Sequence, residues 1–271
     1  MSNDFAAQTG RWDPSEYQRH SSGQQQWAQE LFGRLKLRGD ERILDIGCGD
    51  GKITAQIAQQ VPRGSVLGVD SSAEMIAFAR RSFGPPALAN LRFEEANAAS
   101  LTFGPEFDCV VSFACLHWVI DHRPVLAGIR RALRPGGRTL LQFGGRGNAS
   151  EVVAAATTVI ERDRWRNCFK DFPFPWGFHD PQEYRAWLQE AQLEPTRVEL
   201  VPKDMTHRGR EGLIGWVRTT WMPYFHRVPA QDQETFIAEV ADEYLRLHPP
   251  DGQQVVHLKM VRLEAEARRG V

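Results

Sequence analysis

Short apolar runs alternate with segments of helical periodicity along the first half of the chain. Each run is rich in β-branched or aromatic residues, which is typical of a buried strand. We predict strands at residues 41–47, 65–70, 91–96, 107–113 and 138–144. Apolar positions at helical spacing predict helices at residues 52–60, 72–83 and 121–133, the last ended by Pro135-Gly136-Gly137. The alternation indicates parallel crossovers and a doubly wound α/β sheet with helices on both faces.

The second half of the chain is less regular. Helices are predicted at residues 149–164 and 180–192 and in an aromatic-rich region, 212–248. A strand is predicted within residues 196–205. The segment 255–267 alternates untidily and is predicted as a last strand, although a helix is possible from Leu263 onward.

The composition is that of a globular protein, with 42% hydrophobic and 25% charged residues, and no linker is evident among the 271 positions. We therefore predict a single domain over residues 1–271. The net charge of −1 gives no reason to expect a nucleic acid or an anionic membrane as partner. No apolar run approaches the length of about 20 residues that a membrane span needs. The polar N-terminus lacks the apolar core of a signal peptide, and the four cysteines show no C-x-x-C pair. We expect a cytoplasmic protein with reduced thiols, no metal and a monomeric state.

The segment LDIGCGDG, residues 44–51, follows the first predicted strand and opens the first helix. Gly47, Gly49 and Gly51 allow a sharp bend and a close approach of the backbone to a ligand, although glycines also mark plain turns. A dinucleotide fingerprint would place its third glycine one residue later, where Lys52 stands. The carboxylate of Asp45 would repel a pyrophosphate and suits a cation.

This D-x-G-x-G-x-G loop resembles the signature loop of S-adenosylmethionine-dependent methyltransferases with a Rossmann-like fold. The resemblance implies a mainly parallel seven-stranded sheet and S-adenosylmethionine, which carries an ammonium and a sulfonium, as cofactor. Asp70 ends the second strand, where an acidic residue accepts hydrogen bonds from ribose hydroxyls, although it could also start a helix. Met75 would neighbour the adenine, and Asn97 stands where the family usually has an aspartate bonded to the adenine amino group. The cofactor-binding residues implied are Asp45, Gly47, Cys48, Gly49, Gly51, Asp70, Ser71, Met75, Asn97, Ala98 and Phe113.

The fourth predicted strand ends in Leu116-His117-Trp118. Ligands of doubly wound sheets bind beyond the carboxyl ends of the strands, so these side chains are expected near the methyl group. Trp118 offers a flat face to a substrate, and His117 offers a base if the acceptor is a hydroxyl or an amine. Alternatively, Trp118 is a core aromatic and His117 is solvated.

A closer resemblance is to the trans-aconitate and juvenile hormone acid methyltransferases. It rests on LDIGCGDGKIT, on the FD and LHW of the fourth strand, and on residues 17–28, 215–229 and 248–267. It implies O-methylation of a carboxylate, with Tyr17 facing the pocket and Gln24 orienting the acceptor carboxylate. Trans-aconitate methyltransferase has an arginine at the position of Gln24. This difference argues against trans-aconitate itself and leaves a monocarboxylate or another acceptor open.

The predicted catalytic residues are Gln24, Trp118 and His117. Further acceptor contacts are expected from Arg146 and Arg218, which are alternatively surface arginines, and from Trp216 and Trp221, which suit a buried face equally well. The aromatic loop at residues 172–178 is either a lid or a packing element.

We expect residues 1–36 to form a helical segment over the pocket and residues 37–145 to form the cofactor-binding half. Residues 146–192 and 204–252 would form a helical cap that contacts the acceptor.

Three alternatives stay open beside carboxylate methylation of a small molecule. They are N- or C-methylation, methylation of an acid bound to a carrier protein, and a regulatory protein that binds S-adenosylmethionine without turnover. A nucleic-acid methyltransferase is disfavoured because Ser112-Phe113-Ala114-Cys115 stands where such enzymes carry an N-P-P-Y-type tetrapeptide.

Overall fold

The computed structural model describes residues 22–271 of the chain, and side chains from residue 26 onward. The chain divides into two compact units. The sheet unit contains the described residues up to Arg146, together with Trp176–Val201 and Arg262–Val271. The helical unit contains Gly147–Pro175 and Pro202–Val261.

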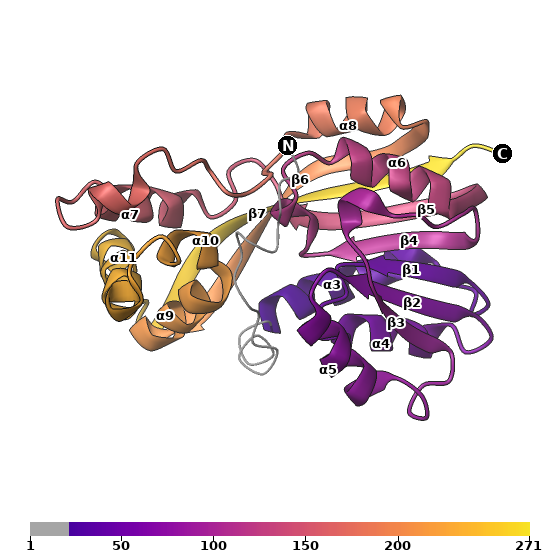
Figure 1. Ribbon diagram of the computed structural model, residues 1–271, viewed down its shortest axis with the longest axis horizontal. Helices are drawn as coiled ribbons and strands as arrows, with labels where there is room; N and C mark the ends of the chain where they lie inside the picture. Colours follow the sequence, from indigo (N-terminus) through magenta and orange to yellow (C-terminus); the bar gives the residue numbers. More distant parts are fainter. Residues whose placement is uncertain (1–21) are drawn as a thin grey trace. The chain divides into compact units, whose positions relative to one another are not determined.

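A seven-stranded sheet forms the sheet unit, in the order β3-β2-β1-β4-β5-β7-β6 (Figure 1). The strands are β1 Arg42–Ile46, β2 Ser65–Asp70, β3 Leu91–Glu95, β4 Phe107–Phe113, β5 Leu133–Gly144, β6 Leu193–Arg208 and β7 Val255–Arg269. Strands β1 to β5 pair in parallel, whereas β7 is antiparallel to β5. The mainly parallel α/β fold predicted from the alternation of strands and helices is confirmed.

Helices cover both faces of the sheet, because its central strands β1 and β4 are buried along nearly their whole length (Figure 1). One face packs on α3 Ser22–Leu35, α4 Lys52–Gln60 and α5 Ala73–Phe83. The other packs on α6 Arg123–Ala132 and α8 Pro181–Glu190. Two short 3₁₀ turns follow strand ends: η1 Ala98–Ser100 after β3, and η2 Leu116–Trp118 after β4.

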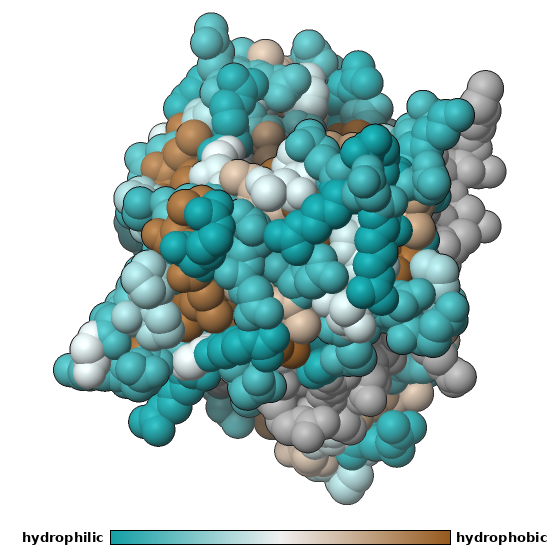
Figure 2. Space-filling view, turned by 90° about the vertical axis from the view of Figure 1, so that its left-hand side faces the viewer, coloured by the Kyte–Doolittle hydropathy of each residue, from teal (hydrophilic) through white to brown (hydrophobic). Residues whose placement is uncertain are grey.

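The helical unit is built around aromatic side chains. Its elements are α7 Ser150–Ile160, η3 Arg166–Phe169, α9 Gly209–Thr220, α10 Met222–Phe225, η4 Ala230–Asp232 and α11 Gln233–Leu247. Phe236 of α11 stacks on Phe169 at 5.3 Å between ring centroids and meets Trp165 edge-on at 5.5 Å. The side viewed in Figure 2 is mainly hydrophilic with small apolar areas. No helix within residues 22–271 has both the length and the apolar character that a membrane crossing requires.

The helix predicted at residues 121–133 is confirmed as α6, but the strand after it begins earlier than predicted. The third predicted helix ends at Ala132, before the Pro-Gly-Gly sequence. Strand β5 then begins, because Leu133 pairs with Phe107, and the ladder resumes with Arg138 opposite Cys109. Residues 135–137 therefore form a bulge within β5 rather than a stop. The last strand predicted at residues 255–267 is confirmed as β7, which pairs with β5 through Leu263, so the alternative helix from this residue onward is absent.

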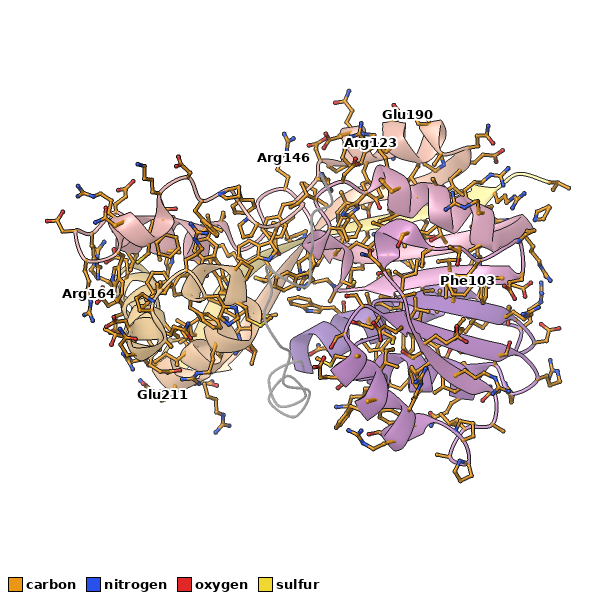
Figure 3. All side chains as sticks on the ribbon, viewed as in Figure 1. Phe103, Arg123, Arg146, Arg164, Glu190 and Glu211 are labelled. Atoms are coloured by element: carbon orange, nitrogen blue, oxygen red, sulfur yellow. The ribbon has the colours of Figure 1, made fainter. Side chains whose placement is uncertain are left out.

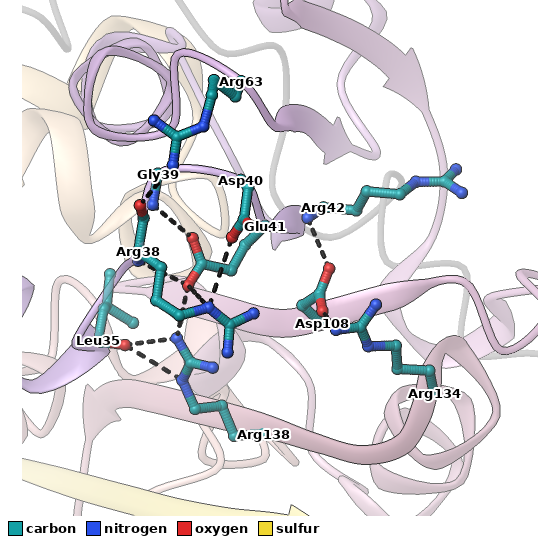
Figure 4. A network of polar contacts seen from close by, with 10 residues as sticks. All are labelled: Leu35, Arg38, Gly39, Asp40, Glu41, Arg42, Arg63, Asp108, Arg134 and Arg138. Carbon is teal, nitrogen blue, oxygen red and sulfur yellow. Dashed lines mark hydrogen bonds and ion pairs between the residues drawn. The ribbon is translucent and has the colours of Figure 1, made fainter.

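A polar network fixes the amino-terminal ends of the strands (Figure 4). The carboxylate of Glu41 is fully buried and accepts hydrogen bonds from the backbone N–H of Arg38, at 2.8 Å, and of Gly39, at 3.0 Å. The guanidinium of Arg138 lies 3.6 Å from it and also donates to the carbonyl oxygen of Leu35, the last residue of α3. Burial raises the pKa of Glu41, but these hydrogen bonds and the charge of Arg138 outweigh it, so the pKa lies below its usual value.

A second carboxylate joins the same ends of β1 and β4 (Figure 4). Asp108 accepts a hydrogen bond from the backbone N–H of Arg42 at 2.8 Å and forms an ion pair with Arg134. Both networks lie at the edge of the sheet opposite the glycine turn, because parallel strands all start there.

Candidate functional site

The glycine turn after β1 has the sharply bent backbone that its sequence predicts. Gly47, Gly49 and Gly51 all have positive φ, at 75°, 53° and 83°. A Cβ on Gly47 would lie 2.1 Å from the Sγ atom of Cys115, so the turn passes against the end of β4. A Cβ on Gly49 would meet nothing within 4 Å. Gly47 therefore serves the fold, while Gly49 borders open space in which a ligand could approach the backbone.

Asp70, at the end of β2, ties the glycine turn to the start of α5. Its Oδ2 accepts a hydrogen bond from the backbone N–H of Gly49 at 3.0 Å, and its Oδ1 accepts one from Ser72 at 2.9 Å. Burial raises the pKa of Asp70, and the hydrogen bonds from Ser72, Gly49 and Ser71 offset part of that rise. A carboxylate has two lone pairs on each oxygen, so Asp70 keeps the capacity to accept further hydrogen bonding from hydroxyl groups of a ligand.

Asp45 lies beneath the turn on β1 and is 2% exposed. The hydroxyl of Thr54 donates a hydrogen bond to its Oδ2 at 2.7 Å. Burial raises its pKa to about 7; the bond from Thr54 acts against the rise and the charge of Asp70 adds to it. A positive ligand group nearby would favour the ionised form, so this carboxyl suits a cation.

The remaining predicted cofactor residues lie at the same edge, after β2, β3 and β4. Ser72 caps α5 by accepting a hydrogen bond from the backbone N–H of Met75, and the Met75 side chain is buried. Asn97 is exposed, and its amide oxygen already accepts a hydrogen bond from the backbone N–H of Ala99 at 2.9 Å. It thus caps η1, which leaves one lone pair of that oxygen for a ligand. Phe113 is buried and meets Phe32 edge-on at 6.3 Å.

Trp118 stands in η2 at the carboxyl end of β4 and is 9% exposed. Its ring meets that of Trp176 edge-on at 6.1 Å, and Trp176 stacks on Phe178 at 5.7 Å with an interplanar angle of 7°. The backbone N–H of Gly177 donates to the carbonyl oxygen of His117 at 2.8 Å. The end of the aromatic loop therefore packs on η2, which extends the aromatic surface beside Trp118.

His117 is half-buried next to the end of β5. Its Nδ1 accepts a hydrogen bond from the backbone N–H of Gly144 at 3.5 Å. Burial, then the positive charge of Arg262, then His122 hold the pKa of His117 well below its usual value. The imidazole is therefore neutral at pH 7, and this bond assigns its proton to Nε2. In that state His117 is a hydrogen-bond donor toward a ligand and a poor base.

His122 was not anticipated from the sequence. It is fully buried, with Nε2 2.8 Å from the carbonyl oxygen of Leu116 and Nδ1 3.3 Å from the hydroxyl of Tyr184. Burial lowers its pKa to about 3, with the neighbouring His179 as second cause. A neutral imidazole here donates to Leu116 and so supports η2 from below. The two partners of His122 belong to different elements, Leu116 to η2 and Tyr184 to α8. No local sequence pattern therefore predicts these hydrogen bonds.

Four further residues predicted to bind the acceptor have contacts with other protein groups. The side chain of Arg146 is 68% exposed, projects outward (Figure 3), and lies 3.6 Å from Asp180. Trp216, Arg218 and Trp221 belong to the helical unit. There Arg218 forms a two-pronged ion pair with Glu234. Trp216 and Trp221 are buried with their rings 6.0 Å apart.

The assignment of the helical unit as a cap, and of these side chains as acceptor ligands, stays a prediction. Tyr17 and the side chain of Gln24 lie outside the described residues.

Comparisons with known proteins agree with this geometry. Residues 43–137, which carry the glycine turn, Asp70 and η2, match the model of a family described as "Methyltransferase domain". A trans-aconitate 2-methyltransferase of Deinococcus radiodurans is 32% identical over 83% of this chain and 87% of its own length. A protein of the same name from Methylobacterium nodulans is 28% identical over 95% of this chain and 98% of its own length.

A solved structure shares the fold over nearly the whole chain. It is phosphoethanolamine N-methyltransferase 2 of Haemonchus contortus with phosphomonomethylethanolamine and S-adenosylhomocysteine bound. The two structures superpose with a TM-score of 0.62 and are 19% identical in sequence. The superposition covers 99% of this chain and 60% of the other. The glycine turn, the carboxylate of Asp70 and the relatives that share them together show that the chain belongs to the S-adenosylmethionine-dependent methyltransferase family.

Proposed function

We propose that this methyltransferase transfers the methyl group to a carboxylate oxygen of a small acid. The observation that carries the proposal is the state of His117, which is neutral and accepts a hydrogen bond at Nδ1 from Gly144. A hydroxyl or ammonium acceptor has to lose a proton to a base, whereas a carboxylate is already ionised at pH 7. A site with a donor in place of a base therefore favours the carboxylate. The relatives named trans-aconitate 2-methyltransferase support the same acceptor class.

The cofactor is held at the carboxyl ends of β1, β2 and β3. Asp70 accepts hydrogen bonds from the two ribose hydroxyls, and the turn at Gly49 lets the amino-acid part approach the backbone. Asp45 provides a negative charge beneath the turn for the positive groups of the cofactor. Met75 and Asn97 contact the adenine.

The protein's part in the reaction is alignment. S-adenosylmethionine supplies, when bound, a methyl group on a positive sulfur that an anionic oxygen displaces in line. The C–O bond forms as the C–S bond breaks, and its electron pair leaves with the sulfur, so no proton moves. Trp118 limits the positions open to the acceptor, and Nε2–H of His117 donates to the carboxylate. Holding both reactants in line and excluding water are the main sources of rate in such a step.

Transfer of a labelled methyl group tests the proposal. The purified chain is incubated with methyl-labelled S-adenosylmethionine and a panel of small carboxylic acids, alcohols and amines. We expect label in an ester, which mild alkali releases as methanol. Trp118→Ala is expected to lower kcat/KM for the acid at least about tenfold through lost alignment. Alkali-stable label on an amine or a carbon would refute the acceptor class.

The other acceptor classes give different results in the same assay. A protein-bound acid would place the label on a carrier protein and on no free acid. A regulatory protein would bind S-adenosylmethionine in calorimetry and label nothing. The relatives named trans-aconitate 2-methyltransferase align with this chain over most of their length. They favour a small-molecule acceptor over a carrier-bound acid and over a regulatory protein.

A further inference from the structure

The chain leaves β4 through a strained residue. Ala114 has a φ of 53°, in the left-handed region that a residue with a Cβ rarely adopts, and its backbone N–H donates to the carbonyl oxygen of Gln142 on β5 at 2.8 Å. Cys115 follows in a right-handed conformation, and η2 then contains only three residues. So short a 3₁₀ turn is not stable by itself. Contacts with other elements therefore have to hold this strained bend in place.

Hydrogen bonds to its carbonyl oxygens hold η2 from two sides. The backbone N–H of Gly177 donates to the carbonyl oxygen of His117 at 2.8 Å. The carbonyl oxygen of Leu116 accepts from the backbone N–H of Val119 at 2.8 Å, and Nε2 of His122 lies 2.8 Å from the same oxygen. Unlike the two backbone bonds, the bond from His122 is made by a side chain. A substitution can therefore remove it while the backbone bonds remain.

Buried neighbours hold the imidazole of His122 in one position. Its ring meets Phe143 edge-on at 4.9 Å and His179 edge-on at 4.5 Å between centroids. A carbonyl oxygen only accepts, so the proton lies on Nε2, and Nδ1 accepts from the hydroxyl of Tyr184 at 3.3 Å. Since these contacts fix the ring, they also fix the position of its donor and of the carbonyl oxygen of Leu116 that accepts from it.

We propose that His122 is a positioning residue for methyl transfer, which holds η2 so that Trp118 and His117 keep one orientation toward the acceptor. The inference rests on the proposed function, in which these two side chains align the acceptor with the methyl group. His122 is fully buried, so it acts through the carbonyl oxygen of Leu116 and not by contact with the acceptor. Alignment matters for an in-line step, because a shift of about 1 Å costs about 100-fold in rate.

Two amides of different reach separate this hydrogen bond from polarity in general. The amide nitrogen of glutamine reaches about as far from the backbone as Nε2 of histidine, and that of asparagine only as far as Nδ1. His122→Gln therefore keeps a donor to Leu116, whereas His122→Asn loses it. We expect His122→Asn to lower kcat about 10- to 100-fold and His122→Gln to lower it less than about threefold. The KM for the acceptor should change less than kcat in both variants.

The assay is designed so that unfolded protein does not count as a loss of rate. Activity is measured with the acid of the labelled-methyl panel that wild type methylates fastest, and kcat is expressed per S-adenosylmethionine site counted by calorimetry. The Kd for S-adenosylmethionine should be the same in wild type and both variants, because Asp70 and the glycine turn are unchanged. Glu41→Gln, which removes a buried charge at the opposite edge of the sheet, should lose stability but keep the kcat of wild type.

Hydrogen exchange tests the same bond without any acceptor. The backbone N–H groups of Trp118 and Val119 donate within the turn, to the carbonyl oxygens of Cys115 at 3.0 Å and of Leu116 at 2.8 Å. In His122→Asn these two amides should exchange at least about tenfold faster than in wild type, because the turn opens more often. In His122→Gln their exchange should stay close to that of wild type.

A second variant covers the case in which His122→Asn does not fold. Tyr184→Phe removes only the hydroxyl that orients the imidazole, and it is expected to lower kcat about three- to tenfold. An unchanged kcat per site in Tyr184→Phe would then count against the proposal.

Three results would overturn the positioning role of His122. They are equal kcat per site in wild type and His122→Asn, equal losses in His122→Asn and His122→Gln, and unchanged amide exchange of the turn in His122→Asn. Methylation of an alcohol or an amine in place of an acid would contradict the proposed function, and the variants are then compared with that acceptor. If no acceptor is labelled, the amide exchange decides alone.

Discussion

The Nε2 atom of His122 lies 2.8 Å from the carbonyl oxygen of Leu116, the first residue of the turn that carries His117 and Trp118. The imidazole that supports the turn is itself held by the hydroxyl of Tyr184. The turn that carries His117 and Trp118 is therefore supported by the buried pair of His122 and Tyr184.

His122 is expected to make the fold sensitive to acid. Its pKa falls from 6.5 in the unfolded chain to about 3 in the folded one, so below pH 6.5 the unfolded state binds a proton that the native state does not. The stability is complete above pH 6.5 and lost as pH falls toward 3, with about 2 kcal/mol lost by pH 5 from this one group. Urea denaturation at pH 7 and pH 5 measures it. His122→Gln should be less stable at pH 7 by about 1–3 kcal/mol and lose less on acidification.

The matched variant for this prediction is Tyr184→Phe, which removes a partner of His122 but no titrating histidine. It should lower stability at both pH values by similar amounts. An acid response of His122→Gln equal to that of wild type would show that this imidazole does not carry the effect.

Alanine substitutions at Gly47 and Gly49 are expected to differ in their effects on stability and on cofactor affinity. A methyl group on Gly47 would lie 2.1 Å from the sulfur of Cys115 at a φ of 75°, so Gly47→Ala should cost more than about 2 kcal/mol of stability. Gly49→Ala meets no protein atom and should cost only about 1–2 kcal/mol through its positive φ. Its methyl group would occupy the space proposed for the cofactor, so its main effect should be on affinity. Thermal melting and calorimetry with S-adenosylmethionine distinguish the two, and a reversed order would contradict this assignment.

Asp70 is expected to dominate cofactor affinity. Asp70→Ala removes the proposed acceptor of two ribose hydroxyl bonds and frees the N–H groups of Gly49 and Ser72. Loss of such charge-assisted bonds should raise the Kd for S-adenosylmethionine at least about 10- to 100-fold. Asp163→Ala, at an exposed carboxylate of the helical unit, should leave the Kd unchanged. If Asp70→Ala binds as tightly as wild type, the cofactor lies elsewhere.

Glu41 is expected to affect stability without affecting the site. Its pKa is held below 4.5, so its contribution is present above pH 4.5 and lost as pH falls further. Glu41→Gln should cost about 1–3 kcal/mol at pH 7, because a buried charge-assisted network loses its anion. Asp40→Asn, at a half-exposed pair with Arg38, should cost less than about 1 kcal/mol. Both variants should bind S-adenosylmethionine as wild type does, since the network lies at the opposite edge of the sheet; weaker binding by Glu41→Gln would argue against that separation.

Local spacing of residues was enough to predict several parts of this protein. Alternation of apolar runs and helical periods gives the five parallel strands, and the glycines after β1, with Asp70 at the end of β2, mark the edge at which we propose that the cofactor binds. Each of these features spans a few residues and follows from backbone geometry, so no distant contact is needed to recognise it. The same logic started the fifth strand at Arg138, whereas β5 begins at Leu133, because the pairing of Leu133 with Phe107 is a distant contact that local spacing does not contain.

Long-range contacts set the surroundings of the turn that carries His117 and Trp118. His122 meets Tyr184 across 62 residues, and Gln142 meets Glu264 across 122. Arg262 reaches its position because β7 enters the sheet antiparallel beside β5, a pairing that the untidy alternation of residues 255–267 does not specify. Burial then fixes the chemistry, since His117 is neutral because of its surroundings, not because of its neighbours in the sequence. A side chain's charge state and partners are set by long-range packing, which a linear pattern does not contain.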